Sequence, residues 1–285
     1  MFRCGPTDYA EKVSIEPPRI SLSTSSVYPL GTAAGFELAK RTGYDAVEVM
    51  VGVDDVSADI NAVRALSEAH EIPIASVHAP CLLVTQRVWG TEHWGKLHKA
   101  AEMAMTVGAE TVVVHPPFRW QREYARGFVK GIAKLEDEYP VTFAVENMYP
   151  WRTGNRVFQA YAPGWDPSDF TYKNVTIDFS HAAVARIDTL KLLKNLGERV
   201  AHIHLADGTG SALDEHLVPG RGTQNCGVLL EHLVATGFTG NIAVEINTRK
   251  AADEAAREAD LLEALAFARL HTAPVATKNS DTTGA

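Results

Sequence analysis

The segment Thr111-Val-Val-Val-His115 contains three consecutive valines and ends in a histidine. Five residues are too few for a helix, and a β-branched run without polar alternation is typical of a strand buried on both faces of a parallel sheet. Seven further runs of this kind lie along the chain, at Ile20–Thr24, Ala46–Val51, Ile74–His78, Thr142–Glu146, Val175–Asp178, Ala201–Leu205 and Ile242–Ile246. The sequence therefore predicts eight buried parallel strands.

Stretches with helical spacing separate the predicted strands, as at Asp59–Ala69, Leu97–Val107, Phe128–Leu135 and Thr189–Leu196. Ser57 is a suitable N-cap for the first, and Gly108 and Gly197 fall where helices should end. Eight alternating strands and helices in a chain of this length predict a single-domain α/β fold, a closed (β/α)8 TIM barrel. An open doubly wound sheet would need a Gly-rich turn after the first strand, and Ser21–Ser26 contains no glycine.

The barrel is expected to span residues 19–272, between an N-terminal extension at 1–18 and a disordered polar tail at 273–285. The extension is charged and has no apolar core, so it is not expected to be a secretory signal. No apolar run is long enough to predict a membrane span. These features predict a cytoplasmic protein with no membrane partner.

The composition excludes several functional classes. The 285 residues are 46% hydrophobic and 22% charged, which is ordinary for a globular protein and excludes general disorder. The formal net charge of −8 argues against non-specific binding to nucleic acid. Cys4, Cys81 and Cys226 are too few and too scattered for a disulfide framework or a four-thiolate zinc site.

Polar residues lie at the ends of seven consecutive predicted strands, namely Glu48, His78, His115, Glu146, Asp178, His204 and Glu245. A barrel brings all its strand ends to one mouth. Three histidines and four acidic groups cannot stay unpaired there, because burying an isolated charge costs several kcal/mol. A divalent cation is the simplest compensation, and a mixed set of histidine and carboxylate ligands suits zinc, manganese, iron or cobalt.

Further groups lie close to these strand ends. His181 follows the sixth strand within Asp178-Phe-Ser-His181, and Asp214-Glu-His216 offers an Asp-x-His pair in the loop after the seventh strand. His202 is expected to face the helices and to have a structural role. Structural alternatives also exist for single residues, because Asp178 suits a helix N-cap and a histidine such as His78 suits a hydrogen-bonded core position.

Two long connections, residues 149–172 and 206–224, are expected to shape the substrate site. They contain three candidate substrate-binding residues, Trp151, Arg152 and Arg221, to which we add Glu48. Arginine binds phosphate or carboxylate in a bidentate manner. The alternative for Arg221 is a solvent-exposed turn residue, and for Glu48 a charged rim residue or an arginine partner.

The chain from Ile20 to Leu270 resembles the xylose-isomerase-like superfamily, which includes sugar and sugar phosphate isomerases and epimerases, inosose-processing enzymes and endonuclease IV. The motifs that carry this resemblance are Val77-His-Ala-Pro80, Val114-His-Pro-Pro117, Val145-Glu-Asn147, Ile177-Asp-Phe-Ser-His181, His202-Ile-His-Leu205 and Val244-Glu-Ile-Asn247. They indicate the fold and the metal site more specifically than the substrate.

The resemblance to the epimerases implies one metal ion held by Glu146, Asp178, His204 and Glu245. Glu146 and Glu245 would then transfer a proton α to a carbonyl from opposite faces of the substrate, and His181 would orient the substrate or a ligand. The expected activity is a divalent-metal-dependent isomerase or epimerase of a small sugar, sugar phosphate or inosose. Zinc or manganese is the expected metal, with cobalt, iron or magnesium as alternatives, and a homo-oligomer is plausible.

The resemblance to endonuclease IV implies an alternative, a zinc phosphodiesterase acting on abasic DNA. Its three zinc ions would use the same four ligands together with His78, His115, His181, Asp214 and His216. The sequence departs from that group at His115-Pro-Pro117 and in the bulky segment 146–151, and no basic stripe is visible in the loops after the second and third strands. These departures favour a small carbohydrate as partner over nucleic acid. A metal-binding barrel with another lyase or binding role is the third alternative.

Overall fold

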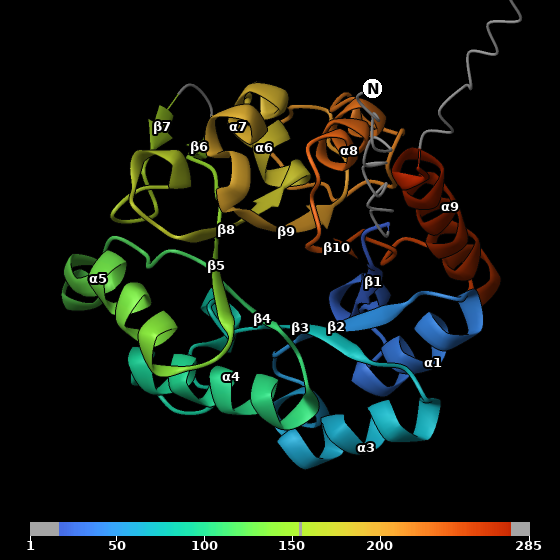
Figure 1. Cartoon of the computed structure of the whole chain (residues 1–285), viewed down its shortest axis with the longest axis horizontal. Helices are drawn as coiled ribbons and strands as arrows, with labels where there is room; N and C mark the ends of the chain where they lie inside the picture. The colour runs from blue at the N-terminus through green and yellow to red at the C-terminus, as the bar shows by residue number, and fades with distance from the viewer. Residues whose placement is uncertain (1–16, 154–155, 275–285) are drawn as a thin grey trace, which may run out of the picture.

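The computed structural model describes residues 17–153 and 156–274. Within them eight parallel strands close into a barrel in the order β1-β10-β9-β8-β5-β4-β3-β2 (Figure 1). The strands are β1 (Ile20–Ser23), β2 (Ala46–Met50), β3 (Ile74–His78), β4 (Thr111–Val114), β5 (Thr142–Glu146), β8 (Asn174–Asp178), β9 (Val200–Leu205) and β10 (Asn241–Val244). The predicted TIM barrel is confirmed, and each observed strand overlaps the predicted run.

Helices surround the barrel (Figure 1). They are α1 (Thr32–Thr42), α2 (Asp55–Ala58), α3 (Ile60–His70), α4 (His93–Val107), α5 (Arg122–Glu138), α6 (Phe179–Ala185), α7 (Thr189–Leu196), α8 (Cys226–Ala235) and α9 (Glu254–Thr272). Gly108 and Gly197 end α4 and α7 as predicted, both with positive φ. The predicted cap at Ser57 was wrong. Ser57 lies inside α2, and α3 is capped by Asp59, which directly precedes it and accepts the N–H groups of Asn61 and Ala62.

The core lies between the strands and the helices. Outward-facing valines such as Val49, Val77 and Val112 are fully buried there against Phe36 of α1, Phe128 of α5 and similar side chains. Because neighbouring strands are parallel, their C-terminal ends meet at one mouth of the barrel. This packing fixes the position of the mouth, and the residues that end the strands are held at it.

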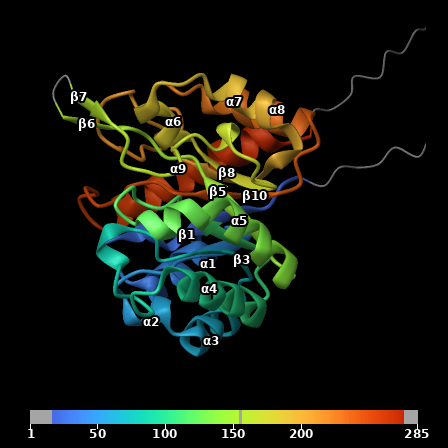
Figure 2. The ribbon, with the colours of Figure 1, turned by 90° about the vertical axis from the view of Figure 1, so that its left-hand side faces the viewer.

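A two-stranded antiparallel sheet that the sequence did not predict lies within the long segment after β5. It consists of β6 (Trp151–Thr153) and β7 (Arg156–Phe158). In Figure 2 this hairpin lies at the left end of the molecule. The predicted loop over residues 149–172 therefore contains a pair of strands, which begins a few residues after the C-terminal end of β5.

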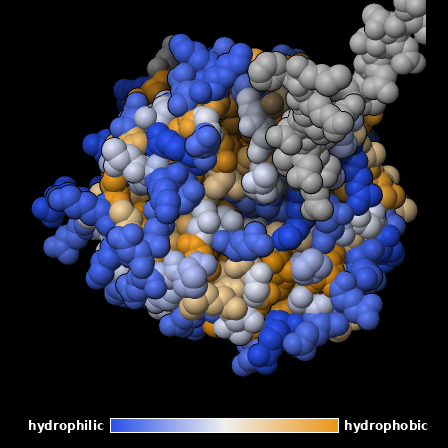
Figure 3. All heavy atoms as spheres, in the orientation of Figure 1, coloured by the Kyte–Doolittle hydropathy of each residue, from blue (hydrophilic) through white to orange (hydrophobic). Residues whose placement is uncertain are grey.

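The predicted extension at 1–18 and the predicted tail at 273–285 fall largely outside the described residues. None of the helices in the described ranges is both long enough and apolar enough to cross a membrane. On the face shown in Figure 3, hydrophilic side chains cover most of the circumference, and apolar atoms lie between them and towards the centre.

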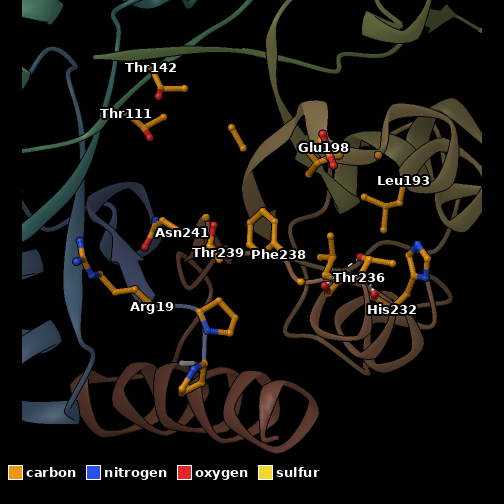
Figure 4. Close-up of a pocket in the computed structure, with 18 of the residues that line it drawn as sticks. Arg19, Thr111, Thr142, Leu193, Glu198, His232, Thr236, Phe238, Thr239 and Asn241 are labelled. Carbon is orange, nitrogen blue, oxygen red and sulfur yellow. Dashed lines mark hydrogen bonds between the residues drawn. The ribbon is translucent and has the colours of Figure 1, made fainter. Parts of the chain in front are cut away.

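A cavity of about 1010 Å³ opens at the end of the barrel where the strands begin (Figure 4). Arg19, Thr111, Thr142 and Asn241, which start or precede strands, are among its lining residues, whereas the predicted site residues are not. Active sites of TIM barrels lie at the C-terminal ends of the strands. We therefore place the candidate site at the opposite mouth.

Candidate metal centre

Glu146, the last residue of β5, lies at the centre of a buried cluster of imidazole groups. Its Oε2 is 3.3 Å from Nε2 of His78 and 2.9 Å from Nε2 of His115. Its Oε1 is 3.0 Å from Nδ1 of His181 and 3.2 Å from Nδ1 of His204. None of the five residues is more than 5% exposed. Five of the predicted ligands therefore meet at one carboxylate.

The strand register explains this convergence. His78, Glu146 and Asp178 are the final residues of β3, β5 and β8, and these strands run in the same direction. Asp178 lies opposite His204 in the register of β8 and β9. The chain then turns into α6, where Asp178 accepts the backbone N–H of His181 and so caps the helix. Asp178 is therefore both the N-cap of α6 and a residue of the barrel mouth.

Three carboxylates surround Nδ1 of His204. This nitrogen lies 2.8 Å from Oε2 of Glu245, 3.2 Å from Oε1 of Glu146 and 3.6 Å from Oδ2 of Asp178. The Asp178 oxygen is buried and accepts no hydrogen bond from the described residues. One imidazole nitrogen supplies at most one proton to this group. The remaining repulsion between carboxylates would be relieved by further protons on the neighbouring imidazoles or by a divalent cation.

A third group forms around Asp214 in the segment between β9 and α8. Oδ2 of Asp214 is 3.1 Å from Nε2 of His181 and 3.1 Å from Nε2 of His216. Its Oδ1 accepts a hydrogen bond from Ser180 at 2.8 Å, and the hydroxyl of Tyr149 lies 3.4 Å from Oδ2. His181 therefore belongs to two neighbouring groups, because its Nδ1 contacts Glu146 and its Nε2 contacts Asp214.

The orientation of three histidines fits metal ligands. Nδ1 of His78, His181 and His216 lies 3.0, 2.9 and 2.7 Å from the backbone carbonyls of Ala79, Asn147 and Glu245. A neutral imidazole that donates its Nδ1 proton to a carbonyl presents the lone pair of Nε2 at its other edge. In all three residues that lone pair faces a carboxylate. A cation between the two acceptors removes the repulsion, so these residues fit a divalent metal.

Without a cation, the imidazoles must balance the carboxylates by binding protons. Burial by itself would lower the pKa of His216, but Asp214 and Asp178 outweigh burial and raise this pKa to about 10. Burial would raise the pKa of Glu146, but the neighbouring histidines, led by His204 and His115, hold this pKa well below its usual range. A metal ion would take the place of these protons.

Comparison with known proteins identifies the family. Residues 36–270 match the model of a xylose isomerase-like TIM barrel. The chain belongs to this family. A protein of Mycobacterium tuberculosis that carries the name "uncharacterized" is 46% identical over 273 residues, which are 89% of this chain and 97% of the relative.

Two solved structures of similar fold bear names that indicate different chemistries. A D-tagatose 3-epimerase-like protein aligns with a TM-score of 0.63 and 22% identity, over 88% of this chain and 98% of that protein. An AP endonuclease, family 2, from Brucella melitensis aligns with a TM-score of 0.60 and 18% identity, over 81% of this chain and 93% of that protein. At these identities the likeness shows the shared barrel fold.

In this family member, a buried carboxylate organises the loop that carries Asp214 and His216. Asp207 is 1% exposed, and its two oxygens accept the backbone N–H groups of Gly208, Gly220, Gly222 and Gln224 at 2.8 to 3.0 Å. A Cβ atom on Gly222 would lie 2.3 Å from an Asp207 oxygen, so only glycine fits there. Asp207 thereby closes the base of the loop, and the loop holds its two predicted ligands at the mouth.

Arg221, predicted to bind substrate, pairs instead with acidic residues of an outer helix in this structure. Its guanidinium group lies 2.9 Å from Asp260 and 3.0 Å from Glu263, both on α9. Its side chain is 47% exposed. These ion pairs and this exposure favour the turn-residue alternative for Arg221, and substrate binding by Arg221 stays a prediction.

Glu48, predicted to bind substrate, with a charged rim residue or an arginine partner as alternatives, is 0% exposed and pairs with no arginine among the described residues. One prediction for the barrel interior was wrong. His202, expected to face the helices, contacts Glu48 inside the barrel with Nε2 2.9 Å from Oε2. Side chains two residues apart along a strand point to the same face, so His202 and His204 must share the interior.

Trp151 belongs to an aromatic cluster beside the site. It packs with Phe118, Trp120, Phe158 and Tyr161, with ring centroids 5.5 to 6.4 Å apart. Arg152 follows it on β6, half-buried, and its Nε finds no hydrogen-bond partner among the described residues. Substrate binding by Trp151 and Arg152 stays a prediction.

Sequence reasoning missed several residues that support the site. Asn147 accepts the N–H of Asp178 at 2.7 Å and donates to its carbonyl at 3.1 Å, which ties the end of β8 to β5. Ser25 donates to Oε1 of Glu245 at 2.9 Å. Asn147 could have been identified from the sequence, because it is a polar residue directly after a glutamate that ends a strand. Ser25 lies 220 residues from Glu245, and only the closed barrel reveals that contact.

Proposed function

We propose that this chain is a divalent-metal-dependent isomerase or epimerase of a small carbohydrate, either a sugar, a sugar phosphate or an inosose. The residues that would hold the ion are Glu146, Asp178, His204 and Glu245. The observation that carries the proposal is the convergence of three carboxylates on one imidazole nitrogen at the barrel mouth. The likeness to a D-tagatose 3-epimerase-like protein supports it.

Glu245 and Glu146 would move the proton. Burial would raise the pKa of Glu245, but His204 holds this pKa below its usual value, so the carboxylate is ionised and able to accept a proton. Ser25 fixes one of its oxygens, and its side chain is 11% exposed. Glu146 would return a proton on the opposite face of the substrate carbon.

A bound divalent ion would polarise the carbonyl and hydroxyl oxygens of the substrate and so acidify the carbon between them. Zinc or manganese suits these ligands, and cobalt, iron or magnesium are alternatives. His181 would orient the substrate or a ligand, because Asp214 and the carbonyl of Asn147 fix both of its ring nitrogens. The aromatic cluster around Trp151 would form one wall over the sugar.

A second candidate function rests on one specific observation. Both oxygens of Glu146 contact histidines. Oε2 contacts His78 and His115, and Oε1 contacts His181 and His204. A carboxylate with both oxygens in contact with histidines is better suited to bridging two metal ions than to acting as a freely accessible base. With His78, His115, His181, Asp214 and His216 as additional ligands, the centre would hold several zinc ions and suit hydrolysis of a phosphodiester such as abasic DNA.

The number of metal ions and a solvent-exchange assay together test the proposal. Untagged protein purified without chelator would be analysed by elemental mass spectrometry and then incubated with ketoses and inososes in deuterium oxide. About one exchangeable ion per chain and deuterium incorporation α to a carbonyl are expected. Two or three tightly held zinc ions, incision of abasic duplex DNA and no exchange into any sugar would support the second candidate and overturn the first.

A further inference from the structure

Glu48 of β2 lies inside the barrel, on the interior side of His204. Glu48, Ser76, His202 and His204 are all 0% exposed. Ser76, which faces Glu48 across the β2–β3 register, donates to Oε2 at 2.7 Å. Nε2 of His202 lies 2.9 Å from Oε2, and Nε2 of His204 lies 3.1 Å from Oε1. The carboxylate is therefore enclosed by one hydroxyl and two imidazoles.

No lysine or arginine is paired with Glu48 among the described residues. A buried carboxylate needs positive partners: Ser76 donates a hydrogen bond to Glu48, and the two imidazole nitrogens lie within ion-pair distance of it without the geometry of a standard hydrogen bond. Neither ring nitrogen of His202 makes a standard hydrogen bond within the described residues, but Nε2 lies 2.9 Å from Oε2 of Glu48, whereas no acceptor is recorded beside Nδ1. An unpartnered lone pair is tolerated better than an unpartnered N–H. The proton of His202 therefore belongs on Nε2, facing Glu48.

The same reasoning applies to His204. Its Nε2 faces Glu48, and its Nδ1 faces the three carboxylates at the mouth. His78 and His216 have the opposite arrangement, with Nδ1 on a backbone carbonyl and Nε2 towards the site. His204 therefore presents a different nitrogen to the centre, and the structural cause is the carboxylate at its other edge.

We infer that Glu48 is a positioning residue for the metal centre. It holds His204 with a proton on Nε2, so that Nδ1 is free to ligate, and His202 and Ser76 hold Glu48 in place. Carboxylates that bind the far nitrogen of a ligating histidine fix its tautomer and increase its basicity. This inference rests on the proposed metal-dependent function, although the contact between Glu48 and His204 exists without a metal.

The position of the His204 proton tests the inference directly. In protein labelled with 15N-histidine, two-bond proton–nitrogen correlation spectra distinguish protonated from unprotonated ring nitrogens. His204 should carry its proton on Nε2 in the zinc-loaded wild type. A proton on Nδ1 would overturn the inference. Because this measurement uses the unmodified protein, it decides the question even if a variant fails to fold.

The variant Glu48→Gln provides the second test, because its amide has a single acceptor oxygen for two imidazoles. We expect its Co2+ affinity to fall by about 10- to 100-fold and its visible Co2+ spectrum to shift. The matched control Glu263→Gln makes the same change at an exposed residue of α9, so its affinity and spectrum should stay those of the wild type. Unchanged affinity and spectrum in Glu48→Gln would overturn the inference, as would a metal ion bound between Glu48 and His202.

Failure of this inference can be distinguished from failure of the proposed function. If the wild-type protein binds Co2+ but Glu48→Gln binds it equally well, the metal centre stands and the positioning role is wrong. If the wild type binds no divalent ion, the proposed function fails.

Discussion

Asp178 and His204 face each other across β8 and β9, with Oδ2 of Asp178 3.6 Å from Nδ1 of His204. This oxygen accepts no hydrogen bond from the described residues, whereas Oδ1 of the same side chain caps α6 by accepting the N–H of His181. One carboxylate therefore stabilises a helix with one oxygen and leaves the other for the site.

Asp178→Asn should separate these two roles. Asparagine is also a good N-cap, so the thermal stability of the metal-free protein should change little. Metal affinity should fall by at least about 10-fold, because a charged ligand is lost. Metal content and melting temperature would be measured beside Asp188→Asn, which alters the cap of α7 instead. A variant that retains metal with wild-type affinity would exclude Asp178 as a ligand.

Glu245→Gln should abolish proton transfer and leave the fold intact. Loss of a positioned general base reduces the rate by about 10²- to 10⁴-fold. Deuterium incorporation into a ketose or inosose substrate measures this effect, with circular dichroism as the check on folding. Glu263→Gln, an exposed change on α9, is the matched control. The two-glutamate mechanism would fail if the Glu245 variant exchanged deuterium at the wild-type rate.

Asp207→Ala should release the loop that carries Asp214 and His216. Four backbone N–H groups would lose their acceptor, and each buried donor left unpaired costs about 1 to 3 kcal/mol. The free energy of unfolding should fall by about 3 kcal/mol or more in urea titrations. Asp188→Ala removes only a helix cap and should cost about 1 kcal/mol. Equal losses in the two variants would contradict the proposed role of Asp207 in the loop.

Arg221→Ala should leave activity and metal content unchanged, because its guanidinium group binds Asp260 and Glu263 outside the mouth. The ion pairs are exposed, so their loss should lower the free energy of unfolding by no more than about 1 kcal/mol. Steady-state kinetics and chemical denaturation would check both values. A large increase in KM would instead return Arg221 to the substrate site.

Metal binding should release protons at neutral pH. Neighbouring carboxylates raise the pKa of His216 to about 10 and hold the pKa values of His181 and His204 well above their usual range despite burial. These imidazoles are therefore protonated at pH 7 in the metal-free chain, and an ion must displace their protons. Affinity should rise from pH 6 to pH 8. Calorimetry in buffers of different ionisation enthalpy counts the protons, and identical heats in all buffers would exclude their release.

Much of the architecture could be predicted from the sequence, because a strand buried on both faces needs a continuous apolar run and the polar residue that ends it stands out. Glu146 and Asp178 were identified in this way, and the barrel brings both to the predicted mouth. The β6–β7 hairpin gave no such signal, since β7 is exposed and carries no buried run.

The departures from the sequence predictions have physical causes. The direction of Arg221 depends on two acidic residues of α9 about 40 positions later in the chain, which no local pattern reveals. The sequence predicted Glu48 at the end of its strand, but β2 continues to Met50. Glu48 therefore lies deeper in the barrel than the residues that do end their strands. For His202, side chains two residues apart along a strand lie on the same face, so the sequence already indicated that it shares the barrel interior with His204.

The barrel closes through its last strand, since β10 pairs with β9 on one side and β1 on the other. Glu245 directly follows this strand, and its partner Ser25 lies in the short 3-10 helix Thr24–Val27 that directly follows β1. During synthesis on the ribosome, a chain that has emerged only as far as β9 lacks both the closing strand and this carboxylate. We therefore expect the ion to be acquired only after β10 has emerged and closed the barrel, so that metal occupancy would report on barrel closure.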